Sequence, residues 1–157
     1  MFNLEDLINE LEKKGIRYLL IGGQAVTIYG SPLVSFDFDF WIDPTQRKDF
    51  FKIADSLDFE YGEDIKNKPL VVFYAEEEKI DAFFVKKMST KGGCSLVFEE
   101  CYKKAVSLKD PTGFIIHVPN IDDLIALKTC KKKPSAKDLE DIEYLRIIKK
   151  KLKKGSI

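Results

Sequence analysis

Hydrophobic and polar residues alternate with a period of two along residues 35–42. In a β-strand this alternation sends neighbouring side chains to opposite faces, so we expect the aromatic face to be buried. That face holds Phe36, Phe38, Phe40 and Ile42. The opposite face carries Asp37, Asp39 and Trp41, for which we expect half-buried packing of the indole. The rise of roughly 3.3 Å per residue separates the two carboxylates by about 7 Å along the strand.

The same patterns divide the rest of the chain into further elements. Apolar residues at helical spacing predict helices. The last two form a C-terminal pair, in which Asn120 caps the first helix and Pro134-Ser135 separates it from the second. We expect them over 4–14, 24–29, 45–57, 95–104, 120–130 and 136–153. Short apolar runs predict strands over 17–21, 35–42, 69–74 and 79–85, and a hairpin formed by 105–108 and 114–118. Thr45 is the expected N-cap of the third helix, and 86–93 is an expected loop. We therefore expect an α/β fold with a small mixed sheet and a C-terminal helical pair.

The length of 157 residues fits a single domain, and 45% hydrophobic residues are enough for a sizeable core. We expect an α/β core over 1–119 and C-terminal helices over 120–154. No apolar run is long enough for a membrane span and the N-terminus has no signal-peptide pattern, so we expect a soluble cytoplasmic protein. The three cysteines match no zinc-binding spacing and are interpreted as free thiols.

The zero net charge conceals a basic C-terminal segment. Between Lys128 and Lys154 there are eleven Lys and Arg against four Asp and Glu, a net charge of +7. Such a segment binds nucleic acid in some proteins, which would make affinity fall steeply with salt, and in others it is a solvated face.

Asp37 and Asp39 lie on one predicted strand, and Asp81 lies on a later one, where we expect it to point to the face opposite its apolar neighbours Ile80 and Ala82. An acid in an apolar strand is costly to bury without a partner, and two neighbouring carboxylates repel each other. A divalent cation relieves both costs, and oxygen ligands favour Mg²⁺ or Mn²⁺. If the two strands are adjacent, the three carboxylates form a cluster suited to two-metal phosphoryl or nucleotidyl transfer. The alternative is a solvated edge strand with an ordinary acid at Asp81.

Gly22-Gly23 lies where a predicted strand passes into a predicted helix. Glycines let a ligand approach the backbone, and the first N–H groups of a helix favour an anion such as phosphate. Alone, the pair is equally explained by a tight turn.

These motifs together resemble the nucleotidyltransferase fold of the DNA polymerase beta superfamily. The likeness rests on Gly22-Gly23-x-Ala25, Gly30-Ser31-Pro32, Asp37-Phe38-Asp39 and Asp81. It is similar in particular to minimal nucleotidyltransferases and to abortive-infection nucleotidyltransferase toxins, which often end in a helical pair like the one expected here.

The resemblance implies transfer of a nucleoside monophosphate from an NTP to a hydroxyl of a protein, an RNA or a small molecule. Asp37 and Asp39 would bind Mg²⁺ or Mn²⁺, as two ions, and Asp81 would bind metal or act as general base. Gly22, Gly23 and Gln24 would contact the triphosphate. Lys128 is either a phosphate contact or a solvated helix lysine.

Two departures from the family pattern favour a second hypothesis. Gly23 replaces the serine of the usual Gly-Ser pair, and Leu33-Val34 stand where close relatives carry an arginine. Both losses weaken the expected binding of phosphate. The alternative is therefore a weak or inactive module that acts by binding a small helical partner, for example in a toxin–antitoxin pair.

Overall fold

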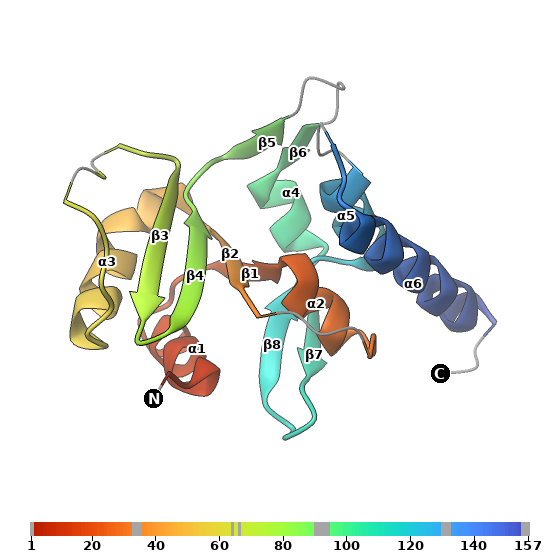
Figure 1. Ribbon diagram of the computed structural model, residues 1–157, viewed down its shortest axis with the longest axis horizontal. Coiled ribbons are helices and arrows are strands. Elements are labelled where there is room, and N and C mark those ends of the chain that lie inside the picture. Colours follow the sequence, from red (N-terminus) through yellow and green to blue (C-terminus); the bar gives the residue numbers. More distant parts are fainter. Residues whose placement is uncertain are drawn as a thin grey trace.

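The main sheet has four strands in the order β1-β2-β4-β3 (Figure 1). Its strands are β1 (Tyr18–Ile21), β2 (Phe38–Ile42), β3 (Leu70–Ala75) and β4 (Glu78–Phe83). The central strands β2 and β4 are parallel, and the two outer pairings are antiparallel. The structure is a computed structural model, and it describes residues 2–32, 36–63, 65, 67–89, 95–129 and 133–154. The predicted small mixed sheet is confirmed.

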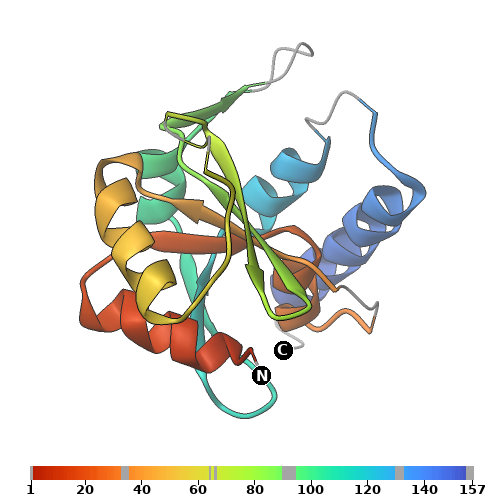
Figure 2. The same cartoon turned by 60° about the vertical axis from the view of Figure 1, so that its left-hand side comes forward.

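Helices α1 (Leu4–Lys13) and α3 (Arg47–Ser56) cover one face of this sheet (Figures 1 and 2). The apolar positions of both helices turn inward and are buried against the aromatic face of β2. These side chains are Leu7, Ile8, Leu11, Phe50, Ile53 and Ala54. Phe40 and Ile42 are fully buried, as the alternation predicts, and Phe38 packs at the margin of the same core. Phe36 is 78% exposed, so the prediction that it is a core residue is wrong; β2 begins only at Phe38.

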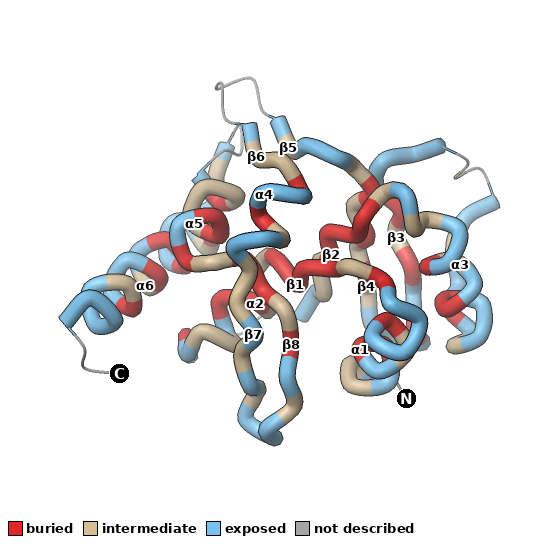
Figure 3. Tube along the Cα trace, turned by 180° about the vertical axis from the view of Figure 1, so that it is seen from behind, coloured by how far each residue is buried: buried red, intermediate tan, exposed pale blue. Residues whose placement is uncertain are grey.

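The acidic face of β2 is also covered, by a second apolar cluster. Helix α4 (Phe98–Lys103) and a two-stranded sheet of β5 (Lys87–Ser89) and β6 (Ser95–Val97) flank it. Trp41 packs edge-to-face on Phe98 and donates its indole N–H to the carbonyl oxygen of Val85 at 2.8 Å. Trp41 is fully buried, so the expectation of half-buried packing is wrong. β1 is buried along its whole length and β2 over its last three residues (Figure 3).

The rest of the chain packs at the β1 side of the sheet. The hairpin of β7 (Val106–Lys109) and β8 (Ile115–Val118) lies against β1, and α2 (Gly22–Ile28) follows β1 directly. The helices α5 (Ile121–Thr129) and α6 (Ala136–Lys153) form the predicted C-terminal pair. Asn120 accepts a hydrogen bond from the N–H of Asp123, and Ser135 and Asp138 form a capping box.

Two predicted boundaries differ from the structure because of capping and local pairing. Asp43, not Thr45, caps the start of the third helical segment, where a 3₁₀ turn η1 (Pro44–Gln46) precedes α3. The carboxylate of Asp43 accepts hydrogen bonds from the N–H and hydroxyl of Thr45, at 2.9 and 2.8 Å. The segment 95–104, predicted as one helix, begins with β6, which pairs with β5 inside the segment predicted as a loop.

No helix within the described part of the chain is both long enough and apolar enough to cross a membrane.

Candidate functional site

The parallel pairing of β2 and β4 brings two of the predicted carboxylates together. In this register Asp39 is the direct partner of Asp81, and Phe38 is the partner of Ile80. Ile80 and Ala82 are fully buried in the main core, so Asp81 must point to the other face, as predicted. Asp39 and Asp81 therefore stand side by side on the acidic face.

The first glycine of the Gly-Gly pair lies against one of these carboxylates. Gly22 has a φ of +72°, and a Cβ built there would lie 2.4 Å from Oδ2 of Asp39. A side chain at position 22 would therefore be strained by the left-handed backbone and would also collide with the carboxylate of Asp39. Gly22 is also the first residue of α2, and no side chain caps this helix start. The sequence indicated a turn at this point, and the structure shows that the turn packs on Asp39.

A cavity of about 490 Å³ opens above this acidic pair. Gly22, Asp39, Asp81 and Lys128, all predicted site residues, line it. The β5–β6 sheet contributes Lys87, Met88 and Ser89 from one strand and Leu96 from the other. Its remaining walls are Ile21, Phe83, Val85 and Leu127. The cavity combines an acidic floor with largely apolar walls.

Asp37 lies at the edge of this arrangement rather than in the cavity. Its side chain is 57% exposed, and its carboxylate is 4.0 Å from the ammonium of Lys79. The same ammonium lies 3.3 Å from Oδ2 of Asp81. Burial lowers the pKa of Lys79, but the hydrogen bond to Asp81 and the charges of the three aspartates raise it above its ordinary value overall.

The donor set fits a divalent cation in part. Oδ1 of Asp81 is buried and has no hydrogen-bond partner among the described residues, which is the condition expected of a carboxylate oxygen reserved for a ligand. The described residues contain no group of three or more His, Cys, Asp and Glu side chains close enough to bind a metal together. Asp39 and Asp81 are thus the candidate ligands in the cavity, and Asp37 would complete the set only after leaving Lys79.

Lys128 is buried and engaged by acids rather than open to a ligand. Its ammonium lies 2.8 Å from Oδ2 of Asp141 and 3.2 Å from Oδ1 of Asp138, both on α6. Lys137 pairs with the second oxygen of Asp141 at 3.0 Å. The interpretation as a solvated lysine is therefore wrong, whereas the interpretation as a phosphate contact stays a prediction. Lys128 lines the cavity as part of a charged network that joins α5 to α6.

The remaining predicted phosphate contacts lie in the first turn of α2. Gly23 and Gln24 are half-buried and do not line the cavity. The carbonyl oxygen of Gly23 accepts a hydrogen bond from the hydroxyl of Thr27 at 3.1 Å. Leu33-Val34, the place of the expected arginine, lies outside the described residues.

Sequence reasoning missed two lysines of this site. Lys79 is two residues before Asp81 and so projects from the same strand face, a signal that the period-two rule offers. Lys87 is exposed at the cavity wall, and none of the described contacts pairs it with an acid. Only the pairing of β5 with β6 places Lys87 at this wall.

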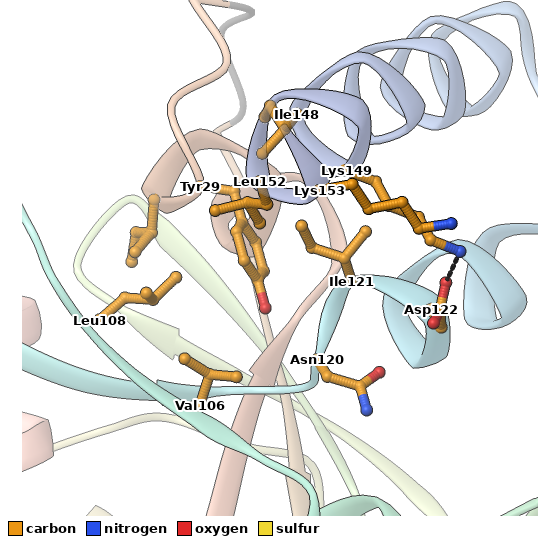
Figure 4. A pocket seen from close by; sticks show the side chains of 11 residues that line it. Tyr29, Val106, Leu108, Asn120, Ile121, Asp122, Ile148, Lys149, Leu152 and Lys153 are labelled. Atoms are coloured by element: carbon orange, nitrogen blue, oxygen red, sulfur yellow. Dashed lines mark hydrogen bonds and ion pairs between the residues drawn. The ribbon is translucent and has the colours of Figure 1, made fainter. Parts of the chain in front are cut away.

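A larger, more apolar cavity of about 580 Å³ lies elsewhere (Figure 4). It is bounded by the C-terminal end of α2, the N-terminal end of α5, β7 and α6. Tyr29 donates its hydroxyl to the carbonyl oxygen of Pro119 at 2.6 Å, and Asp122 pairs with Lys149 at 2.6 Å. Among the described residues, its lining includes one acid, Asp122, which is already paired, so this cavity lacks the paired carboxylates of the Asp39–Asp81 site.

His117 also lies apart from the Asp39–Asp81 site. Its two ring nitrogens lie 2.8 Å from the hydroxyl of Ser107 and 2.8 Å from the carboxylate of Glu12.

The family model described as "Nucleotidyl transferase of unknown function (DUF2204)" matches residues 2–157. No curated protein matches the chain in sequence.

Solved structures of nucleotidyltransferases share the fold. The lincomycin-bound lincosamide antibiotic adenylyltransferase LnuA superposes with a TM-score of 0.69 at 15% identity, over 93% of this chain and 98% of its own. ANT(2″)-Ia in complex with adenylyl-2″-tobramycin gives a TM-score of 0.65 at 10% identity, over 98% and 97%. A putative nucleotidyltransferase from Thermotoga maritima gives 0.62 at 12% identity, over 96% and 91%. The expected nucleotidyltransferase fold is confirmed.

Proposed function

The chain belongs to the nucleotidyl transferase family DUF2204, and from that membership we propose that it transfers a nucleoside monophosphate from an NTP to an acceptor hydroxyl. The observation that carries this proposal is the pairing of Asp39 with Asp81 beside Gly22 on the floor of the 490 Å³ cavity. An acceptor oxygen attacks the α-phosphorus, and pyrophosphate leaves.

Asp39 and Asp81 would hold Mg²⁺ or Mn²⁺, with Asp37 as a third ligand. When bound, the metal would neutralise the charge of the triphosphate and make the α-phosphorus more electrophilic. The set of protein ligands is small, so waters and substrate oxygens would complete the coordination, as is usual for Mg²⁺.

Each remaining residue of the site has a role that its position supports. The uncapped N–H groups at the start of α2, beginning at Gly22, point a partial positive charge toward an anion. Lys87 at the cavity wall is suited to a phosphate contact, in place of Lys128, whose charge is already compensated. If Asp81 does not bind the metal, its unpartnered Oδ1 is instead suited to accept the proton of the acceptor hydroxyl.

One solved neighbour is named a lincosamide antibiotic adenylyltransferase, and another is a complex with adenylyl-2″-tobramycin, so ATP and a hydroxyl-bearing small molecule form the first pair to test. The apolar walls of the cavity, including Phe83, Leu96 and Leu127, are suited to an acceptor with apolar surface.

Calorimetry of ATP binding tests the site directly. Wild-type protein should bind ATP with Mg²⁺ and lose at least tenfold in affinity without it. Asp39→Asn should lose the magnesium-dependent part of the binding. Asp49→Asn, an exposed acid on α3 that is 60% accessible, removes the same charge far from the cavity and should bind as wild type does. Unchanged magnesium-dependent binding by Asp39→Asn would contradict the proposal.

The second candidate, a weak or inactive module that binds a partner protein, is favoured by two features. Gly23 supplies no hydroxyl, and Lys128 is already paired with two carboxylates. Titration with each of the four NTPs separates the candidates, because a partner-binding module would give no heat with any of them.

A further inference from the structure

Three carboxylates and one ammonium form a two-by-two array on the acidic face of the sheet. Asp39 is the register partner of Asp81, and continuing the parallel register by one residue places Lys79 opposite Asp37. All four side chains project from the same face, because each pair is two residues apart on its strand. Lys79 is the one cation within reach of this set among the described ion pairs.

The ammonium of Lys79 spans two of the carboxylates. It lies 3.3 Å from Oδ2 of Asp81, within hydrogen-bond distance, and 4.0 Å from Oδ2 of Asp37. Its side chain is 38% exposed, whereas that of Asp81 is 15% exposed. The lysine side chain is therefore more accessible to solvent than the carboxylate that it contacts.

The array does not satisfy its most buried acid completely. Lys79 contacts Oδ2 of Asp81, while Oδ1 is buried with no hydrogen-bond partner among the described residues. A single ammonium contributes one charge to three carboxylates, so the array keeps a net charge of −2. One divalent cation would neutralise this remaining charge of −2.

We propose that Lys79 is a resident counter-ion of the metal site, which holds Asp81 and Asp37 together without metal and is displaced from them when a divalent cation binds. The inference rests on the proposed function, since it assigns these aspartates to metal binding. A compact ammonium on a flexible four-carbon stem is suited to such an exchange. Lys79 thereby lowers the affinity for metal alone and stabilises the metal-free protein.

Titration of Mn²⁺ without nucleotide tests this proposal, with the free ion followed by electron paramagnetic resonance. Lys79→Met keeps the length of the stem and removes the charge, so Mn²⁺ should bind about five- to tenfold more tightly than to wild type. Lys79→Arg keeps the charge and should stay within twofold of wild type. Lys48→Met removes the same charge from an exposed position on α3 and should also stay within twofold.

Thermal unfolding gives an independent readout. Without metal, Lys79→Met should unfold at a lower temperature than wild type, because three carboxylates lose their cation. Mn²⁺ should raise its midpoint by more than it raises that of wild type. If Lys79→Met does not fold without metal, Lys79→Gln, which keeps a hydrogen-bond donor, replaces it in both measurements.

The outcomes separate this inference from the proposed function. If wild type and Lys79→Met bind Mn²⁺ equally while Asp39→Asn does not bind it, the counter-ion role is overturned and the metal site stands. If none of the variants binds Mn²⁺, with or without ATP, both proposals are overturned. If only Lys79→Met binds the metal without nucleotide, the counter-ion role is supported in its strongest form.

Discussion

At the residue scale, Gly22 leaves room for the carboxylate of Asp39. Its left-handed φ of +72° and the 2.4 Å approach of Asp39 to a built Cβ both require glycine. Gly15 has nearly the same φ, +67°, but nothing lies within 4 Å of its built Cβ. Both glycines therefore have a left-handed backbone, but only Gly22 lacks the space for a side chain.

We predict that Gly22→Ala abolishes magnesium-dependent ATP binding, whereas Gly15→Ala preserves it. Each substitution should cost about 1–2 kcal/mol of stability, because alanine is strained in the left-handed region. Only Gly22→Ala also displaces the carboxylate of Asp39. Calorimetry and thermal unfolding on both variants measure the two effects separately, and equal loss of ATP binding in both would refute the contact.

Cys101 gives a second prediction at this scale, which concerns pH. Burial, helped by the neighbouring charge of Asp123, raises the pKa of its thiol to about 12. A thiol in the unfolded chain has a pKa near 8.5, so the folded protein holds this proton more tightly. The resulting stabilisation is full below about pH 8.5 and is lost as the pH rises toward 12.

We therefore expect Cys101 to react with a disulfide reagent at pH 8 roughly a thousandfold more slowly in the folded protein than in urea. Peptide mapping after labelling identifies the modified thiol. Rapid labelling of Cys101 in the folded state would show that α4 is not packed on the sheet as described.

At the scale of elements, the junction between α5 and α6 depends on a buried charge network. Lys128 is 7% exposed and meets Asp141, which is fully buried, and Asp138, which is 8% exposed. Lys149 and Asp122 join the same two helices by an exposed pair. A buried pair that loses one partner leaves an uncompensated charge, whereas an exposed pair is screened by water.

We predict that Lys128→Met lowers the free energy of unfolding by about 3–5 kcal/mol, and that Lys149→Met changes it by less than about 1 kcal/mol. Urea unfolding of both variants checks the difference. If Lys128→Met were as stable as wild type and instead lost affinity for ATP, Lys128 would be a phosphate contact after all.

At the scale of the whole molecule, one core extends through the sheet and the C-terminal helices. Leu124 on α5 and Leu145 and Ile148 on α6 belong to the same buried cluster as Leu7 and Phe40. The division into 1–119 and 120–154 is therefore a division of the sequence across a shared core. Trp41, the single tryptophan, lies in the separate cluster on the acidic face and reports on that side.

We expect the full chain to unfold in one transition, with coincident midpoints by tryptophan fluorescence and far-ultraviolet circular dichroism. A chain ending at residue 119 should lose cooperative unfolding, because the apolar surface that α5 and α6 cover would face water. A stable, cooperatively unfolding fragment would establish two independent units instead.

Much of this fold and site was accessible from local chemistry in the sequence. The alternation at 35–42 identified the buried and acidic faces of β2, because strand geometry fixes which side chains share a face. Asn120 located the start of α5, because its side chain accepts a hydrogen bond from a first-turn N–H group, and Pro134-Ser135 located the break before α6. Asp81 was correctly assigned to the face opposite Ile80 and Ala82.

Tertiary structure decided what depends on contacts between distant segments. Only the parallel pairing of β2 with β4 sets Asp39 beside Asp81, and only the approach of α6 turns Lys128 from a surface residue into a buried ion pair. Trp41 is fully buried because α4 covers a face that the pattern alone left half open. Periodicity assigns a side chain to a face of the sheet. The packing of distant segments then determines which charges and contacts that face meets in the site.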